Sequence, residues 1–335
     1  MSRKPTMEDV KNLAGVSIST VSRVINNSKP VSPDKKEAVL KAIDKLGYKP
    51  NELARSLVKK RSNTIGIILD DPGIEYMAQY IRGIDEVGKL YDFDILLYST
   101  FGDKEVQKKA VEFLSSKQVE GIIVISEQIN NEILYLIKDY KIPYVLLDKY
   151  YNPDEFRTVT FDYEEAMAAM TNLFIENGHT NLMYLTVKSH DYSSDLKQAG
   201  FEKVMTEKSL TKHVFTVKKD SLQDAYNCVS ENLNFIINNK ITGIITSSDE
   251  LATGVLHYCY DHGIDVPKDL SVSGFGNMRY SELVRPSIST VRMTYYDVGA
   301  IAVRKLIKEL QEEEEFKESV KLKFELMIRE TIKSI

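Results

Sequence analysis

The sequence predicts a small all-α head followed by a larger α/β body made of two similar halves, each with a parallel sheet. Three observations predict this division. Apolar residues recur at helical spacing over residues 1–61, whereas from Thr64 onward short apolar runs alternate with helical patterns. The head is also basic and the body acidic. With 335 residues, the chain is long enough for two or three domains.

The charge is divided unevenly along the chain. Residues 1–61 carry 14 Lys and Arg against 6 Asp and Glu, whereas the remaining residues carry 30 and 43, so the formal net charge is -5. A basic head joined to an acidic body is expected when one end of a protein meets the phosphates of nucleic acid.

The head contains signals for two short helices joined by a tight turn. Thr6 and Asp9 form a capping-box pattern, which begins a helix that ends before Gly15. Ser17 is placed to cap a second helix over Ile18–Asn26. The outer side of that helix carries Ile18, Ser19, Ser22 and Arg23. This arrangement indicates a helix-turn-helix, although the same spacing fits part of any small helical bundle.

A third helix and a short linker complete the head. Ser32 and Pro33 provide an N-cap and a first-turn proline, and Gly47 closes the helix that they begin. The following residues, 48–57, are too few to hold a helix alone in water. Taken in isolation, they form a linker.

Residues 16–26, 48–51 and 54–57 together resemble the LacI/GalR family of bacterial transcription regulators, and the resemblance continues through the whole chain. It implies a dimer that places the second helix of each head in the major groove of a pseudo-palindromic operator. Ile18, Ser19 and Arg23 would read bases, because the arginine fork matches guanine O6 and N7. The implied phosphate contacts are Thr6, Ser22 and Asn26, with Ser17 in the same interface.

The same resemblance gives the linker a role. In the family, residues matching 50–61 form a hinge helix that orders only when two copies pack in the minor groove. Leu57 occupies the position of an apolar wedge that enters the central base step, and Arg55 belongs to the same DNA-binding segment. The expected domains are the helix-turn-helix head 1–49, the hinge helix and linker 50–61, and an effector-binding and dimerisation body 62–335.

The body alternates strands with helices. We expect strands at 64–69, 94–99, 121–125, 144–147, 182–186, 213–216, 243–246 and 271–274, and helices at 76–90, from 104, before 144, and at 163–177, 194–206, 222–238 and 250–262. Apolar strands alternating with helices predict parallel sheets covered on both faces. Two such halves, meeting near Phe161 and Asp162, resemble periplasmic sugar-binding proteins, so the expected body is periplasmic-binding-protein-like.

The family resemblance also implies that the last part of the chain visits both halves. After Pro286, a helix over Asp297–Leu310 belongs to the first half, and a strand over Leu322–Met327 returns to the second. The first half is then about 62–161 and 291–319, and the second about 162–290 and 320–335.

Members of the family that sense small molecules bind them between the halves, at the carboxyl ends of the strands. The matching effector-cleft positions are Asp70, Asp162, Lys197 and Asp249. Sugar-sensing relatives usually have Arg at position 197 and Asp at position 276, where this chain has Lys197 and Gly276. Tight sugar binding is therefore not expected, and a sugar phosphate is a further candidate. The alternative for Asp162 and Asp249 is helix N-capping.

Residues 161–164, 274–277, 279, 284–286 and 295–304 resemble the members of the family that act in carbon catabolite control. The corepressor of those regulators is the phosphocarrier protein HPr phosphorylated on a serine. The resemblance implies corepressor contacts at Tyr296, Asp297, Ala300, Ile301 and Arg304, with Lys308 one turn further. A second contact zone comprises Arg82, Asp85, Glu86 and Lys89. Arg304 suits a phosphoserine, because a guanidinium can bind phosphate bidentately. The alternative is a solvated face on which Arg304 or Lys308 pairs with Glu312.

Other functional classes find little support. Cys228 and Cys259 have no metal-site spacing, the five histidines are scattered, and no Gly-x-Ser-x-Gly or phosphate loop is present, so no enzyme, metal or cofactor is expected. No signal peptide or membrane segment is recognised, which favours a cytoplasmic protein over the solute receptor of a transporter. A sugar-responsive repressor of one operon remains the alternative to a carbon catabolite regulator.

Overall fold

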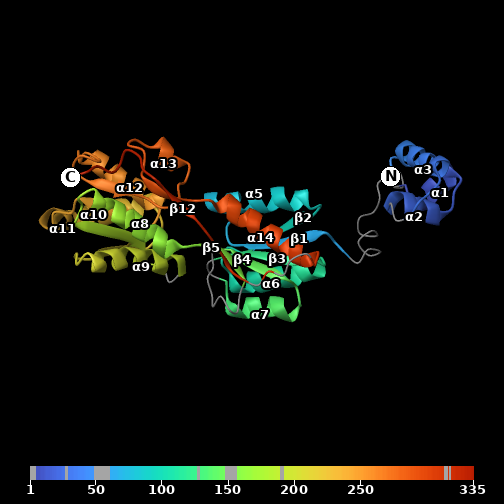
Figure 1. Cartoon of the computed structure of the whole chain (residues 1–335), viewed down its shortest axis with the longest axis horizontal. Helices are drawn as coiled ribbons and strands as arrows, with labels where there is room; N and C mark the ends of the chain where they lie inside the picture. Colours follow the sequence, from blue (N-terminus) through green and yellow to red (C-terminus); the bar gives the residue numbers. More distant parts are fainter. Residues whose placement is uncertain are drawn as a thin grey trace. The chain divides into compact units, whose positions relative to one another are not determined.

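The computed structural model describes residues 5–26, 29–48, 61–126, 129–147, 157–188, 192–312, 316 and 318–335. The chain divides into two compact units, Met1–Asn63 and Thr64–Ile335. Figure 1 shows both units with their helices and strands labelled.

The first unit contains the three expected helices, α1 (Met7–Ala14), α2 (Ile18–Asn26) and α3 (Pro33–Leu46). They share one small core, built on Val10, Val21, Val39, Ala42 and Tyr48. The capping box of α1 is confirmed, since the Thr6 hydroxyl accepts from the Asp9 N–H while the Asp9 carboxylate accepts from the Thr6 N–H. The expectation for Ser32 is wrong in one respect, because its side chain makes no capping hydrogen bond.

The first half of the body is a six-stranded parallel sheet in the order β11-β5-β4-β3-β1-β2. Its strands are β1 (Thr64–Leu69), β2 (Asp94–Ser99), β3 (Gly121–Ile125), β4 (Tyr144–Leu147), β5 (Thr158–Phe161) and β11 (Val320–Leu322). Alternate residues of β1 enter two cores, Ile65 and Ile67 on one face and Ile68 on the other. The helices α5 (Glu75–Leu90) and α14 (Tyr295–Leu310) cover the first face, and α6 (Lys104–Ser116) and α7 (Asn131–Asp139) cover the second (Figure 1).

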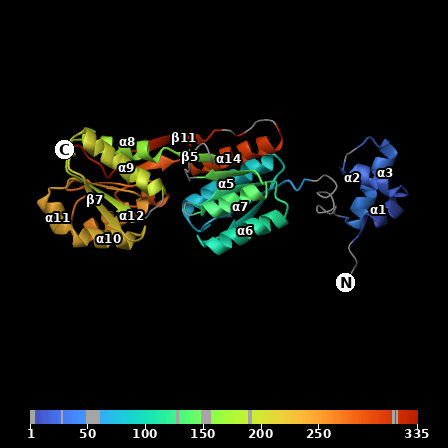
Figure 2. The same cartoon turned by 90° about the horizontal axis from the view of Figure 1, so that it is seen from below.

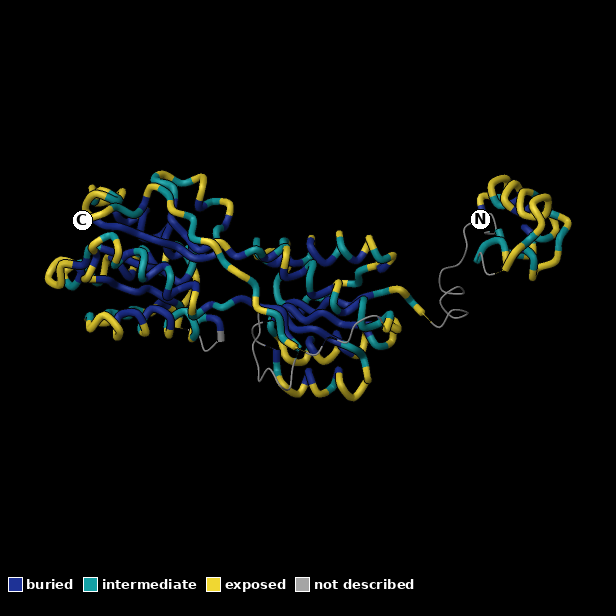
Figure 3. Tube along the Cα trace, viewed as in Figure 1, coloured by how far each residue is buried: buried dark blue, intermediate teal, exposed yellow. Residues whose placement is uncertain are grey.

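The second half is a four-stranded parallel sheet in the order β7-β6-β8-β9. Its strands are β6 (Leu182–Val187), β7 (His213–Val217), β8 (Gly243–Thr246) and β9 (Ser271–Ser273). Figure 2 shows α8 (Tyr163–Glu176) and α9 (Tyr192–Glu207) on one face, and α10 (Leu222–Glu231), α11 (Leu233–Asn238) and α12 (Asp249–Asp261) on the other. Burial follows these layers, since the central strands of each sheet are buried and exposure concentrates on the outer helices (Figure 3).

Two expected elements are each divided in the structure. The helix expected over 222–238 breaks at Asn232, whose side-chain amide donates to the Cys228 carbonyl at 2.8 Å and so ends α10. The strand expected over Leu322–Met327 is two strands on either side of Lys323. The first, β11, pairs with β5, so residues 320–322 lie in the first sheet although the sequence analysis assigns them to the second half.

The second of these strands, β12 (Phe324–Met327), pairs antiparallel with β10 (Thr290–Met293). A short helix, α13 (Tyr280–Leu283), precedes β10 and follows the loop after β9. The chain therefore passes between the halves at three places, after β5, after β10 and at Lys323. These crossings position the cavity described next.

Candidate functional sites

The outer face of α2 presents small polar groups and one arginine. Ser17 caps the helix, since its hydroxyl accepts from the Thr20 N–H at 3.2 Å. The Ile18 side chain is 48% exposed, although isoleucine is normally buried. Arg23 is exposed and makes no hydrogen bond or ion pair with the residues that the structure describes. The outer surface of this one short helix therefore offers an apolar contact and an uncommitted guanidinium.

The expected phosphate contacts have local roles as well. The Thr6 hydroxyl is committed to the capping box of α1, and the Asn26 amide donates to the Ser22 hydroxyl at 3.2 Å. Arg55 and Leu57 lie outside the described residues.

A cavity of about 490 Å³ lies between the two halves of the body. Ile74, Glu75, Tyr76 and Tyr295 line it from the first half, and Lys197, Asp249, Phe275, Met278 and Tyr280 line it from the second. Of the four expected cleft residues, the structure brings Lys197 and Asp249 together here, and Asp70 and Asp162 do not line this cavity.

Asp249 is fully buried at the wall of the cavity. Its carboxylate accepts from the Met278 N–H at 2.6 Å and from the Thr290 hydroxyl at 2.5 Å. Burial raises the pKa of this carboxyl to about 6, against the lowering effect of the two hydrogen bonds. The N-cap of α12 is Ser248 rather than Asp249, so the N-capping alternative is wrong for Asp249.

Lys197 is held by aromatic rings and one carbonyl. Its Nζ lies 4.7 Å from the centre of the Phe275 ring and 5.3 Å from that of Tyr163, and 3.4 Å from the Ser247 carbonyl oxygen. A cation over two ring faces is attracted by their negative quadrupole. Lys197 therefore has contacts of its own within the second half.

The other two expected cleft residues have structural partners elsewhere. Asp70 accepts from the Thr100 hydroxyl at 3.1 Å and from the Ser126 hydroxyl at 2.7 Å. Asp162 caps α8 through the Glu165 N–H and pairs with Lys321 at 3.2 Å. The N-capping alternative is thus confirmed for Asp162.

The helices α5 and α14 pack at unusually close range. A Cβ added to Gly83 would lie 2.1 Å from the Tyr296 carbonyl oxygen, and one added to Gly299 would lie 2.3 Å from that of Tyr80. Each helix therefore places a glycine against the backbone of the other. Because neither glycine can be replaced without moving backbone, the pair forms one stiff platform.

The outer side of this α5–α14 platform carries the expected corepressor residues. Glu86 accepts from the Arg82 Nε at 2.8 Å and from the Tyr296 hydroxyl at 2.9 Å, and Lys89 pairs with Asp85 at 2.5 Å. Asp297 is exposed, Ala300 and Ile301 are half-buried, and Lys308 is half-buried and already engaged by a neighbour.

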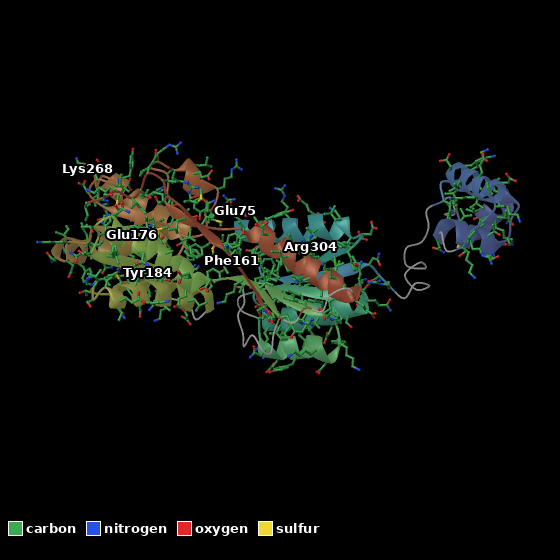
Figure 4. All side chains as sticks on the ribbon, viewed as in Figure 1. Glu75, Phe161, Glu176, Tyr184, Lys268 and Arg304 are labelled. Atoms are coloured by element: carbon green, nitrogen blue, oxygen red, sulfur yellow. The ribbon has the colours of Figure 1, made fainter. Side chains whose placement is uncertain are left out.

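Arg304 stands apart from these paired groups. It is exposed and makes no ion pair with Glu312 or any other residue that the structure describes, so the pairing alternative is wrong for Arg304. Figure 4 labels it on α14, along the exposed side of the first half.

The chain resembles known proteins along nearly its whole length. Residues 6–51 match the family described as bacterial regulatory proteins, lacI family, and residues 171–332 match the periplasmic binding protein-like domain. The chain is 34% identical to the HTH-type transcriptional regulator RegA of Clostridium saccharobutylicum, over 97% of this chain and 98% of that protein. It is 32% identical to catabolite control protein A of Priestia megaterium, over 98% and 99%.

The chain belongs to the lacI family of bacterial regulatory proteins. Its fold agrees with this assignment, since it matches the crystal structure of the lac repressor dimer bound to operator and the anti-inducer ONPF. That match has a TM-score of 0.87 at 23% identity and covers 98% of this chain and 99% of that one. As a lacI-family member with regulators as relatives, the protein is a DNA-binding transcription regulator and not an enzyme.

Several cavity residues of this lacI-family chain escaped the sequence analysis. Glu75, Tyr76, Tyr280 and Tyr295 lie at the starts of α5, α13 and α14, where periodicity gives no information on function. The one available signal was that Glu75 and Tyr295 each begin a helix that follows a strand. Within the described ranges, no three His, Cys, Asp or Glu side chains are grouped to hold a metal ion, and no helix there could span a membrane.

Proposed function

We propose that the protein binds pseudo-palindromic operators as a dimer, with α2 of each head in the major groove. The basic head and the exposed face of α2 support this proposal, and the lac repressor structure that the chain resembles is a dimer on its operator. Arg23 and Ile18 read bases, and the positive charge of the head neutralises phosphates, so operator affinity falls steeply as salt rises. Such a regulator works in the cytoplasm, where the chromosome lies.

The corepressor that fits the body best is HPr phosphorylated on a serine, which makes the protein a carbon catabolite regulator. The observation that carries this proposal is the exposed, uncommitted Arg304 on α14. Most neighbouring charges on the platform are already neutralised, because Arg82 pairs with Glu86 and Lys89 with Asp85. A phosphate dianion arriving at this face therefore meets one guanidinium that is free to bind it bidentately.

The platform also supplies the apolar part of a protein interface. Ala300 and Ile301 are half-buried beside Arg304, and Tyr296 is oriented by its hydrogen bond to Glu86. Because Gly83 and Gly299 lock α5 to α14, these side chains are arranged before the partner arrives. Preorganisation of this kind reduces the entropy that binding must overcome.

The proposal is tested by operator binding in the presence of HPr. Serine-phosphorylated HPr is expected to tighten operator binding by the full-length protein, and operator is expected to strengthen binding of phosphorylated HPr by the same factor. Unphosphorylated HPr is the control. If phosphorylated HPr left operator affinity unchanged while the protein still bound operator, the corepressor assignment would fail and the DNA-binding assignment would stand.

A second candidate is a sugar-responsive repressor of one operon. The cavity of about 490 Å³ between the halves favours it, because its volume suits a small polar ligand. A calorimetric titration of sugars and sugar phosphates against the full chain, beside phosphorylated HPr, separates the two candidates. Micromolar binding of one sugar with no response to phosphorylated HPr would favour this second function.

A further inference from the structure

The loop that follows β9 donates three consecutive backbone N–H groups to side chains from three different elements. The Asn277 N–H donates to the Thr290 hydroxyl at 3.3 Å, and the Met278 N–H to the Asp249 carboxylate at 2.6 Å. The Arg279 N–H donates to the Glu75 carboxylate at 2.9 Å. Successive backbone donors of this kind form a concave site that favours anionic acceptors.

Glu75 is the one acceptor of the three that comes from the other half of the body. Thr290 is on β10 and Asp249 is on α12, both beside the loop, whereas Glu75 is the first residue of α5. Figure 4 labels Glu75 at the end of α5 that faces the second half, and Glu75 also lines the cavity. Its solvent-exposed hydrogen bond therefore joins one half to the other at the edge of the cavity.

Both partners of this hydrogen bond are firmly anchored in their own half. On the second half, Arg329 donates to the Asn277 side-chain oxygen at 2.6 Å and to Glu282 at 2.8 Å, which fixes the loop and α13. On the first half, α5 is locked against α14 through Gly83. Because neither end can follow the other, a rigid separation of the halves must break the bond.

We propose that the Glu75 carboxylate and the Arg279 N–H form a latch that holds the two halves closed over the cavity. The latch is separate from the three chain crossings, so the halves can turn about the crossings once it opens. An occupant of the cavity, or a partner on α5, would act on closure by strengthening or displacing this one contact. The inference concerns closure alone and does not depend on whether HPr is the corepressor.

The experiment removes either partner of the hydrogen bond and measures the distance between the halves. Spin labels are placed at Lys109→Cys on α6 and Lys240→Cys after α11, both exposed, and labelled chains are diluted with unlabelled ones so that one labelled chain is seen per dimer. The native Cys228 and Cys259 are buried, and burial raises the pKa of the Cys259 thiol to about 12, so they resist labelling. Pulsed electron resonance then reports the distance distribution.

Four variants make the test specific. Glu75→Ala removes the acceptor, Glu75→Gln weakens it, and Arg279→Pro removes the N–H at a residue whose φ of -52° already suits proline. Arg279→Ala is the matched control, because it deletes the side chain and keeps the N–H. We expect the population at longer distance to rise about tenfold in Glu75→Ala and Arg279→Pro, less in Glu75→Gln, and not in Arg279→Ala.

The double variant decides whether the two groups act through one contact. Glu75→Ala combined with Arg279→Pro should open the body no further than either change alone, because both delete the same hydrogen bond. An unchanged distance distribution in Glu75→Ala would overturn the latch, as would additive opening in the double variant. Should Arg279→Pro fail to fold, the comparison of Glu75→Ala and Glu75→Gln with wild type still decides the matter.

Discussion

Arg23 and Arg304 are exposed arginines on the two faces proposed for DNA and corepressor binding. Both are exposed and make no ion pair within the described part of the chain, whereas carboxylates pair with Arg82, Arg157, Arg292 and Arg329. An exposed guanidinium without an internal partner remains available to an external anion or base edge. The two arginines are thus the residues on which the proposed DNA reading and corepressor recognition depend most.

The first prediction at this scale concerns Arg23. Arg23→Ala should relax sequence preference at one base pair per half-site, by about 1–3 kcal/mol, because a bidentate contact to guanine is lost. Arg23→Lys should restore part of the overall affinity and little of the preference, since lysine keeps the charge without the fork. Binding to a set of operators with single base changes measures both effects. A uniform loss across all operators would mean that Arg23 contacts phosphate only.

The second prediction concerns the buried Asp249. Its folded pKa of about 6 lies above the ordinary value of 3.8, so the folded state holds the proton more tightly than the unfolded state. This carboxyl therefore stabilises the fold at low pH, and that contribution is lost as pH rises from about 4 to about 6. The loss is on the order of 2–3 kcal/mol.

Chemical denaturation at a series of pH values tests this sign. The free energy of unfolding of wild type relative to Asp249→Asn should fall between about pH 4 and pH 6 and then stay level. Subtracting the two free energies cancels the contributions of other titrating groups. One of these is His179, because burial lowers its pKa and its contribution to stability therefore rises with pH in the acidic range. A difference that rises with pH over this window would contradict the assignment.

At the level of elements, the close packing of α5 against α14 predicts how a substitution at Gly83 changes stability. In an isolated helix, Gly83→Ala should stabilise the helix by about 1 kcal/mol, because alanine is the better helix former. In this protein the new Cβ would meet the Tyr296 carbonyl oxygen at 2.1 Å, so we expect destabilisation of about 1–3 kcal/mol.

The matched control for this change is on the same helix. A Cβ at Gly88 would first meet the Ile95 Cδ1 at 3.2 Å, the end of a flexible side chain, so Gly88→Ala should change stability little. Thermal unfolding of the two variants beside wild type makes the comparison. Equal stability of Gly83→Ala and Gly88→Ala would mean that the α5–α14 contact is looser than described.

The sequence predicted most of these elements and missed several short ones. The three head helices and the long buried strands were predicted nearly to the residue, because apolar periodicity and capping residues define them locally. The short β5, the division at Lys323 and the break at Asn232 were not, because three or four residues carry no period. Of the expected cleft residues, Lys197 and Asp249 reach the cavity, whereas Asp70 is held by two hydroxyl groups and Asp162 caps α8. The hydrogen bond of Glu75 joins positions 204 residues apart, and no local pattern reports it.

At the scale of the whole molecule, the division of the chain after Asn63 makes the next prediction. A fragment that begins at residue 62 should remain folded and dimeric, with both sheets intact, and should lose specific operator binding with the head. The binding-competent full chain should show a strong decrease in affinity with salt, which the fragment should lack. Size-exclusion chromatography and operator titration test the two parts. Specific operator binding by the fragment would contradict the assignment of DNA recognition to the head.

Corepressor recognition is tested by comparing the affinities of HPr and serine-phosphorylated HPr for the wild-type protein and for Arg304→Ala. Arg292→Ala is the matched control, an exposed arginine that already pairs with Glu325 at 3.2 Å. We expect wild type and Arg292→Ala to bind the phosphorylated form far better than the unphosphorylated one. Arg304→Ala should lose that preference, at about 1.5–3 kcal/mol for a charge-assisted contact, while its operator affinity without HPr is unchanged. Equal affinity of the wild-type protein for both forms of HPr would contradict the account.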